Sequence, residues 1–397
     1  MKLLHINVTF SKGSTGSIIK NINNYIEENY KDINTYVAYS AVEENAGGFR
    51  FINDFEFFIL RVFRKLFGKS LFGLYFPTKR LIKYIENIKP DIIHLHTIHH
   101  QTLDYKMLFS YLSDYKGKVI YSLHDCWPFT GGCYYYSPVE CNNFLHGCDN
   151  CPNKKSELDC RKTNVEKEFI IKRKLISDIP DITFVAVSNW LAEEACKSYL
   201  KDKAILTIHN GIDTEIFKPK IVKRDKGFTA LSVATYWSKR KNLSALLEFA
   251  KEFKDIQFLV VGDVDFDFEP QKYTNVTFCG IVKDSKKLCE IYNSADVFLN
   301  LSTAETFGLV TAEAMACGLP VIAFNKTACG EIVAPQCGFV VDSIEDYKKA
   351  ILHIKENDLS QYKETCRNNV QNFYTKNIMC RKYADLYLDY KASKFKE

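Results

Sequence analysis

The chain has 397 residues, enough for two domains of ordinary size, and its 46% hydrophobic and 25% charged residues are typical of globular proteins. The net charge of +5 is mild and does not argue for nucleic-acid binding, and no basic helix with interleaved base-stacking aromatic residues is evident, so we expect no nucleic-acid partner. We predict a cytoplasmic protein, because fourteen cysteines occur without a signal peptide and no apolar run reaches transmembrane length.

Short apolar strands alternate with longer helical patterns along the whole chain, which is typical of parallel β-α-β units. In the first half we predict strands at 3–9, 35–39, 92–95, 119–123, 183–187 and 204–208. In the second half we predict them at 229–233, 257–261, 276–278, 297–301, 321–324 and 339–340. The charged segment 218–227 is predicted to be a linker, and residues 376–390 have a helical pattern. These elements predict an α/β protein of two Rossmann-like domains with a cleft between them.

Residues 13–17 (GSTGS) follow the first predicted strand and precede a helix pattern at 18–29. Glycines in such a loop let the backbone approach a phosphate, but a plain strand-to-helix turn explains them as well. His124 directly follows the strand at 119–123, where a single histidine is more often structural than catalytic. A denser histidine group at an earlier strand end has the appearance of a metal site; it contains His94, His96, His99 and His100.

The segment 57–90 mixes aromatic and aliphatic residues with eight cations and one acidic residue, Glu86. Its cations are Arg61, Arg64, Lys65, Lys69, Lys79, Arg80, Lys83 and Lys89. A basic amphipathic helix of this kind can lie in the headgroup plane of an anionic membrane. The alternative is a helix packed on the first domain with a solvated basic face.

Six of the fourteen cysteines fall in the loop 126–160. Four of them follow the spacing C-x7-C-x6-C-x2-C, namely Cys133, Cys141, Cys148 and Cys151. Four thiolates can hold a structural zinc tetrahedrally. Free thiols and disulfides remain alternatives, of which disulfides suit a reducing compartment least.

Residues 301–324 (LSTAETFGLVTAEAMACGLPVIAF) are the most informative stretch. Glu305 is predicted in a loop at the carboxyl end of a strand, and Glu313 about one turn into the following helix, which Gly318 ends. The helix opens with the backbone N–H groups of Phe307, Gly308, Leu309 and Val310. A helix N-terminus attracts phosphate, and ligands bind at this end of the strands in open α/β sheets. The arrangement suits a sugar nucleotide, with the diphosphate on the amides and the hydroxyls on the acids.

This stretch resembles the Glu-x7-Glu signature of the family-4 retaining glycosyltransferases, which have the GT-B fold. Other segments are similar to that family in the expected order, over nearly the whole chain. They are His124-Asp125, residues 209–213 (HNGID), Arg240-Lys241, residues 260–262 (VVG) and residues 276–282 (VTFCGIV). The cysteine loop is also similar to that of some capsule and exopolysaccharide members.

The resemblance implies an acceptor-side domain at 1–217, a nucleotide-sugar domain at 218–375 and a helix at 376–397 that crosses back to the first domain. Glu305 and His124 are then the catalytic candidates at the donor sugar. The donor-binding candidates are Gly16, Arg240, Lys241, Ile281, Phe307, Gly308, Leu309, Val310 and Glu313. His94, His96, His99 and His100 are expected to line the cleft, because such enzymes need no catalytic metal.

Three positions depart from the family pattern. Tyr236 holds the usual place of the arginine, Asn242 that of a glycine after the lysine, and Val264 that of a second glycine after Gly262. Arg240 is therefore the candidate for the arginine's role.

The implied activity is a retaining hexosyl or N-acetylhexosaminyl transfer from a nucleotide diphosphate sugar, a UDP-sugar more than a GDP-sugar, to a lipid-linked or growing surface polysaccharide. We expect a protein peripheral to the inner face of the plasma membrane. A nucleotide-sugar epimerase of the same fold and a non-catalytic sugar-nucleotide-binding module are the alternatives. The Glu-x7-Glu and HNGID segments argue against the first, and intact Glu305, Glu313, His124 and Lys241 against the second.

Overall fold

The computed structural model describes residues 1–43, 47–67, 74–99, 103–154, 164–222, 227–264 and 272–394. The chain divides into two compact units. The first unit comprises Met1–Ile208 and the chain from Cys380 onward, and the second comprises His209–Met379.

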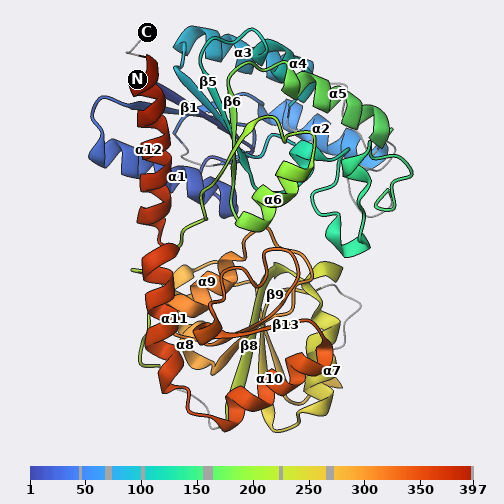
Figure 1. Ribbon diagram of the computed structural model, residues 1–397, viewed down its shortest axis with the longest axis vertical. Coiled ribbons are helices and arrows are strands. Elements are labelled where there is room, and N and C mark those ends of the chain that lie inside the picture. Colours follow the sequence, from blue (N-terminus) through green and yellow to red (C-terminus); the bar gives the residue numbers. More distant parts are fainter. Residues whose placement is uncertain are drawn as a thin grey trace. The chain divides into compact units, whose positions relative to one another are not determined.

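Each unit is built on one parallel sheet with helices on both sides of it (Figure 1). The first sheet has the order β3-β2-β1-β4-β5-β6-β7. Its strands are β1 (Lys2–Asn7), β2 (Asn34–Tyr39), β3 (Phe49–Arg50), β4 (Ile92–Leu95), β5 (Lys118–Leu123), β6 (Ile182–Ala186) and β7 (Ala204–Thr207). The second sheet has the order β10-β9-β8-β11-β12-β13. Its strands are β8 (Phe228–Tyr236), β9 (Ile256–Asp263), β10 (Val276–Gly280), β11 (Val297–Asn300), β12 (Val321–Phe324) and β13 (Gly338–Val341).

The helices connect these strands as crossover elements. Those of the first unit are α1 (Gly13–Asn29), α2 (Asp54–Phe67), α3 (Tyr75–Ile88), α4 (Tyr105–Leu112), α5 (Val165–Ser177) and α6 (Asn189–Lys197). The second unit contains α7 (Leu243–Glu252), α8 (Ser285–Ser294), α9 (Leu309–Ala316), α10 (Ile344–Glu356) and α11 (Ser360–Phe373). The last helix, α12 (Lys376–Lys394), begins in the second unit and continues in the first.

The predicted α/β class is confirmed, and all twelve predicted strands are present with ends shifted by a few residues. Among the described residues, β3 is the one strand that the prediction lacks. It has two half-buried residues and is defined by its pairing with β2, so its sequence carries no periodicity.

Strands covered on both faces read as apolar runs, and β11 and β12 are buried along their whole length. The first sheet departs from this rule, because His5 on β1 and His94 on β4 are fully buried. Two tyrosines of α12 lie against this polar interior. Tyr387 Oη is 2.7 Å from His94 Nδ1, and Tyr383 Oη is 2.9 Å from Ser122 Oγ.

The basic segment 57–90 contains most of α2 and all of α3. Its apolar side chains do not all face one way, since Leu60 is buried while Phe58 is exposed. Arg80 pairs with Glu56 and donates to the Phe51 carbonyl at 2.7 Å. The side chains of Arg61, Arg64 and Lys65, and Lys69 as a whole, lie outside the described residues. Within the helices that the structure describes, none is both long and apolar enough to cross a membrane.

Candidate active site

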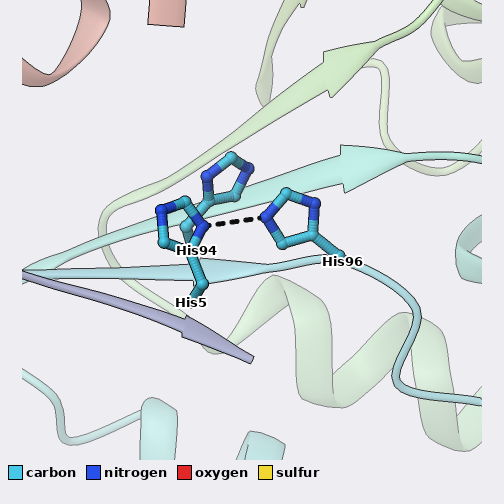
Figure 2. Close-up of side chains that lie close together, drawn as sticks. All are labelled: His5, His94 and His96. Carbon is cyan, nitrogen blue, oxygen red and sulfur yellow. Dashed lines mark hydrogen bonds between the residues drawn. The ribbon is translucent and has the colours of Figure 1, made fainter. Parts of the chain in front are cut away.

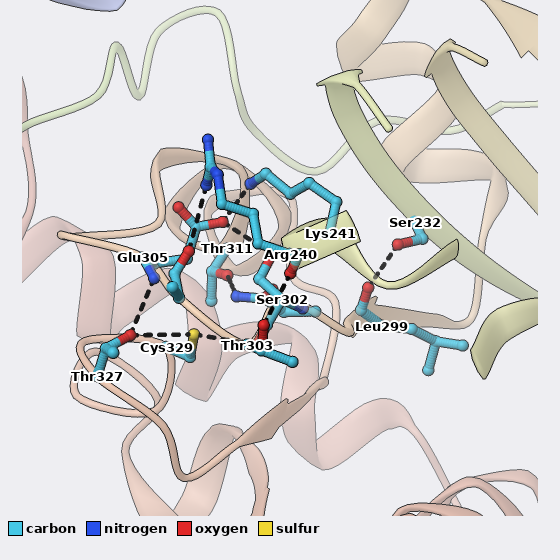
Figure 3. Close-up of polar contacts among 12 residues, drawn as sticks. Ser232, Arg240, Lys241, Leu299, Ser302, Thr303, Glu305, Thr311, Thr327 and Cys329 are labelled. Atoms are coloured by element: carbon cyan, nitrogen blue, oxygen red, sulfur yellow. Dashed lines mark hydrogen bonds and ion pairs between the residues drawn. The ribbon is translucent and has the colours of Figure 1, made fainter. Parts of the chain in front are cut away.

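Glu305 lies in the loop between β11 and α9, at the carboxyl end of the second sheet, as predicted (Figure 3). Its Oε1 forms an ion pair with Lys241 Nζ and accepts a hydrogen bond of 2.9 Å from Ser302 Oγ. Its backbone N–H donates to Thr327 Oγ1 at 2.9 Å. The carboxylate is therefore fixed by a cation, a hydroxyl and a backbone anchor that come from three separate segments.

The Glu305 side chain is buried but ionised. Burial alone would raise the pKa of its carboxyl, but the charges of Lys241 and Arg240 and the Ser302 hydroxyl outweigh burial and lower that pKa below its ordinary value. A buried carboxylate that is held in one position can stabilise positive charge that develops on a bound molecule.

Lys241 and Arg240 come from the 3-10 helix η5 (Lys239–Lys241), which follows β8. The Arg240 guanidinium donates to the Ala304 carbonyl at 3.2 Å, and the Arg240 carbonyl accepts from Thr303 N at 2.8 Å. Asn242 ends this turn with φ +58° and ψ +44°, a left-handed conformation that asparagine tolerates better than most residues. Asn242 therefore takes the conformation that a glycine would supply.

Helix α9 opens directly after the Glu305 loop. Gly308 is its N-cap with φ +93°, and no hydrogen bond in the described part of the chain uses the N–H groups of Gly308, Leu309 or Val310. The helix ends at Ala316, and Gly318 follows with φ +88°, as predicted for a glycine that stops a helix.

Glu313 lies one turn into α9, as predicted. Its Oε2 accepts a hydrogen bond of 2.9 Å from Tyr292 Oη on α8. Burial raises the pKa of the Glu313 carboxyl to about 7, and the hydrogen bond from Tyr292 opposes this shift. The two carboxyls of the Glu-x7-Glu pattern therefore differ, because Glu305 is held as an anion and Glu313 titrates near neutral pH.

Two glycines shape the ends of β9 and β10. Gly262 has φ +128°, and a Cβ there would lie 2.1 Å from the Ala234 carbonyl oxygen, so only glycine fits. Gly280 has φ +62° and is followed by Ile281, whose side chain is exposed.

In the first unit, His124 directly follows β5, and its Nε2 lies 3.1 Å from His96 Nδ1. Burial lowers the pKa of the His124 imidazole to about 4. The neighbouring Asp125 pairs with His99 at 2.8 Å. His94, His96 and His99 are buried, so the expectation that they line a cleft is wrong for these three. His100 lies outside the described residues.

Gly16 is not in a loop before the helix, as the pattern predicts, but in the first turn of α1. A Cβ at this position would lie 2.7 Å from Thr9 Oγ1 and 3.0 Å from the Ser11 carbonyl carbon. The glycine therefore allows the loop after β1 to pack closely on α1, and this packing explains it without a ligand.

The cysteine loop follows His124. Cys133 and Cys148 are buried, and each sulfur accepts an N–H: Asn153 Nδ2 lies 3.5 Å from Cys133 Sγ, and Gly131 N lies 3.2 Å from Cys148 Sγ. Among the described residues, the one group of three potential metal ligands within 4.8 Å of one another consists of histidines, His5, His94 and His96. A zinc at the cysteines stays a prediction.

Two family models match successive parts of the chain. The model described as "Glycosyltransferase Family 4" matches residues 45–216, and "Glycosyl transferases group 1" matches residues 227–357. The chain belongs to glycosyltransferase family 4.

Curated relatives of this family-4 glycosyltransferase include a putative colanic acid biosynthesis glycosyl transferase, WcaC, of Escherichia coli. It is 24% identical over 71% of each chain. An alpha-monoglucosyldiacylglycerol synthase of Acholeplasma laidlawii is 25% identical over 81% of each chain.

Solved structures show the fold. Sucrose-phosphate synthase from Thermosynechococcus elongatus superposes with a TM-score of 0.69 at 16% identity, covering 99% of both chains. HepE from Anabaena, solved with UDP and glucose, gives 0.60 at 15% identity, covering 98% of this chain and all of HepE. This family-4 glycosyltransferase therefore has the predicted GT-B fold of two Rossmann-like domains.

The structure thus brings Glu305, Lys241 and Arg240 together beside the start of α9 in the second unit, whereas His124 and Gly16 belong to the first. Sequence reasoning missed Ser302, Thr327 and Tyr292. Serine, threonine and tyrosine at these places match no motif, and only the packing of loops and helices brings them to the two carboxylates.

Proposed function

We propose that the protein is a retaining glycosyltransferase that moves a hexosyl or N-acetylhexosaminyl group from a UDP-sugar to a hydroxyl of a lipid-linked or growing surface polysaccharide. The observation that carries this proposal is the ionised, buried Glu305 held against Lys241 beside the open N-terminus of α9. The site combines a fixed negative charge with a cationic and amide-rich surface at the end of one sheet.

In the proposed mechanism the donor diphosphate binds the N–H groups of residues 307–310 and the cations of Arg240 and Lys241. Lys241 is paired with Glu305 before binding, so the donor shares this cation with the carboxylate. As the bond from the anomeric carbon to the diphosphate breaks, Glu305 stabilises the positive charge on the sugar. The leaving diphosphate takes the proton of the acceptor hydroxyl on the same face, and the configuration is retained.

Glu313 is proposed to bind the ribose. A carboxylate accepts hydrogen bonds from hydroxyls, and Tyr292 holds Oε2 of Glu313 in place. The backbone around Gly280 and Ile281 would pair with the edge of the base. His124 is proposed to contact the donor sugar from the first unit, and Gly16 remains a weaker candidate because its packing already explains it.

The similar proteins support the proposed sugar donor and acceptor. HepE was solved with UDP and glucose, which supports a uridine nucleotide. The relatives named for colanic acid biosynthesis and for a glucosyldiacylglycerol support a surface polysaccharide or lipid-linked acceptor, with capsule synthesis as one setting.

We also propose a structural zinc and a membrane contact. The thiols of Cys133, Cys141, Cys148 and Cys151 would hold one structural zinc, and the N–H groups at Cys133 and Cys148 suit thiolate ligands. No catalytic metal is expected. The exposed aromatic residues of α2 and α3, among them Phe55, Phe58 and Phe76, would place the enzyme on an anionic inner membrane surface.

The test is transfer itself. Purified protein is incubated with radiolabelled UDP-glucose, UDP-galactose or UDP-N-acetylglucosamine, with and without an undecaprenyl-linked glycan, and the products are separated into lipid and water-soluble fractions. We expect label in the lipid fraction with one donor. Conversion of the donor sugar without acceptor would indicate an epimerase, and donor binding without turnover a binding module.

A further inference from the structure

Three histidines form a continuous hydrogen-bonded chain inside the first unit. His5 is on β1, His96 follows β4 and His124 follows β5. His5 Nδ1 lies 3.0 Å from His96 Nε2, and His96 Nδ1 lies 3.1 Å from His124 Nε2. The rings of His5 and His96 are fully buried. The proposed mechanism uses only His124, so the two inner imidazoles need a separate explanation.

All three rings are neutral. Burial lowers the pKa of His5 to about 3 and that of His124 to about 4, and it holds the pKa of His96 well below the ordinary value. A neutral imidazole has one N–H donor and one acceptor nitrogen. The two hydrogen bonds must therefore run in the same direction along the chain, either from His5 to His124 or from His124 to His5.

The environment of His5, the first of the three hydrogen-bonded histidines, decides in which direction the hydrogen bonds run. His5 Nε2 is buried and, among the residues that the structure describes, has no hydrogen-bond partner. If the bonds ran toward His5, its Nδ1 would accept and its proton would sit on Nε2, as a buried N–H without an acceptor. Orphaned N–H groups are rarer in proteins than unfilled acceptors. The proton of His5 therefore sits on Nδ1, and the bonds run from His5 through His96 to His124.

We propose that His96 is a positioning residue that donates from Nδ1 to Nε2 of His124 and so keeps the proton of His124 on Nδ1. His124 then offers an N–H donor to an oxygen of the sugar, and its Nε2 lone pair is occupied. It is a neutral hydrogen-bond donor and not a general base. This inference rests on the proposed function for the identity of the reaction, and it assigns the chemical role of one residue in it.

A metal ion is the competing explanation, because ring nitrogens of His5, His94 and His96 lie within 4.8 Å of one another (Figure 2). Both nitrogens of His94 are already in use. Its Nδ1 lies 2.7 Å from Tyr387 Oη and its Nε2 lies 2.8 Å from Ser122 Oγ. The 3.0 Å contact between His5 and His96 is an ordinary hydrogen-bond length. Hydrogen bonds therefore explain the short distances among these three histidines without a bound metal ion.

The decisive experiment records long-range ¹H–¹⁵N correlation spectra of the wild-type protein labelled with ¹⁵N-histidine, which distinguish protonated from unprotonated ring nitrogens. The nine histidines are assigned by single substitutions. We expect His5, His96 and His124 each to show a protonated Nδ1 and an unprotonated Nε2. Protonation of His124 at Nε2, or nitrogen shifts typical of a bound metal, would overturn the proposal.

A matched pair of variants adds a kinetic test. The amide nitrogen of asparagine can replace Nδ1 of histidine, whereas that of glutamine replaces Nε2. His96→Asn should keep the donor toward His124, its tautomer and most of the turnover. His96→Gln should lose the N–H that donates to His124 and should change the spectrum of His124. It should reduce kcat by about tenfold, the value of one hydrogen bond, with little change in the KM for the UDP-sugar.

Equal losses in the two variants, with the spectrum of His124 unchanged, would contradict the positioning role. If both variants fail to fold, the wild-type spectrum still decides the tautomer. That spectrum needs no substrate, so a protein that transfers no sugar would count against the proposed function and leave the tautomer to be judged by itself.

Discussion

Tyr292 on α8 donates a hydrogen bond of 2.9 Å from its hydroxyl to Oε2 of Glu313 on α9. The phenol is fully buried and also lies 3.3 Å from the Val310 carbonyl oxygen. The carboxylate that we propose binds the ribose is thus oriented by a residue on another helix, and the hydrogen bond from that residue also lowers its pKa.

Donor binding should depend on pH through Glu313. Burial raises the pKa of its carboxyl to about 7, so the acid is neutral below that pH and charged above it. A ribose hydroxyl donates more strongly to the charged form, so the affinity for UDP-glucose should fall as pH drops through about 7. Titration calorimetry measures this, and the diphosphate of UDP-glucose keeps its charge in that range. Glu313→Gln should bind more weakly and lose this dependence.

Tyr292→Phe extends the same prediction. The hydrogen bond from Tyr292 lowers the pKa of Glu313, so its loss should move the midpoint of the pH dependence upward. An unchanged midpoint would show that another group controls the binding.

The raised pKa of Glu313 also means that the folded protein loses stability as pH rises from about 4.5 to about 7, because the unfolded chain releases this proton first.

Glu305→Gln should fold and bind the donor but lose about 10²–10³-fold in turnover, as expected when a group that stabilises transition-state charge is removed. Steady-state kinetics and donor calorimetry give the two quantities. Transfer close to the wild-type rate would rule out the assigned role. For the wild-type enzyme, NMR of the product should show the anomeric configuration of the donor, and inversion would refute the mechanism.

Lys241→Met should destabilise the second unit. It leaves the Glu305 carboxylate buried without its cation, which costs about 3 kcal/mol in comparable buried pairs. Urea denaturation measures the loss. The double variant Lys241→Met/Glu305→Gln removes both charges and should recover much of that stability. A double variant as unstable as the single one would show that the lysine acts through its packing.

Purified reduced protein should carry about one zinc per chain, bound by Cys133, Cys141, Cys148 and Cys151. Elemental analysis measures the metal content. Cys148→Ser should lower it, whereas Cys196→Ser, at an exposed cysteine on α6, serves as the control and should not. Chelation should leave donor binding by the second unit intact. Metal-free protein with full protease resistance in this loop would exclude a structural zinc.

Anionic liposomes should bind the protein, and added salt should weaken the binding. Replacing Arg61, Arg64, Lys65 and Lys69 with serine should reduce it, as should Phe58→Ser at the exposed face of α2. Phe373→Ser removes a similarly exposed phenylalanine from the second unit and is the matched control. Sedimentation of vesicles rich in phosphatidylglycerol measures the effect. No binding even at low salt would mean that α2 and α3 serve the fold alone.

The architecture was largely predictable because it follows from local signals. Apolar runs such as β12 mark buried strands, and Gly318 ends α9 where the pattern places it. Glu305 could be placed because it closely follows β11, and Glu313 because it lies in the helix that connects β11 to β12. The residues that tune them could not, since Tyr292 reaches Glu313 only through helix packing.

Three further positions show what the sequence pattern could not reveal. Gly16 matched a loop pattern, but the close approach of the loop after β1 requires it inside α1. Asn242 departed from the family pattern, yet its left-handed conformation does the work of glycine. His5 carried no signal, because one histidine in an apolar strand does not reveal that two others will lie beside it.

The hydrogen bond between His94 and Tyr387 joins residues 293 positions apart within one unit. At about 5–20 residues per second, a ribosome needs roughly 15–60 s to make the chain between them. During that time the first unit is exposed to the cell without the tyrosines that cover its polar interior. The first unit therefore cannot finish folding before these tyrosines are made, and a chain truncated before Tyr383 would leave the histidine cluster uncovered and open to chaperones and proteases.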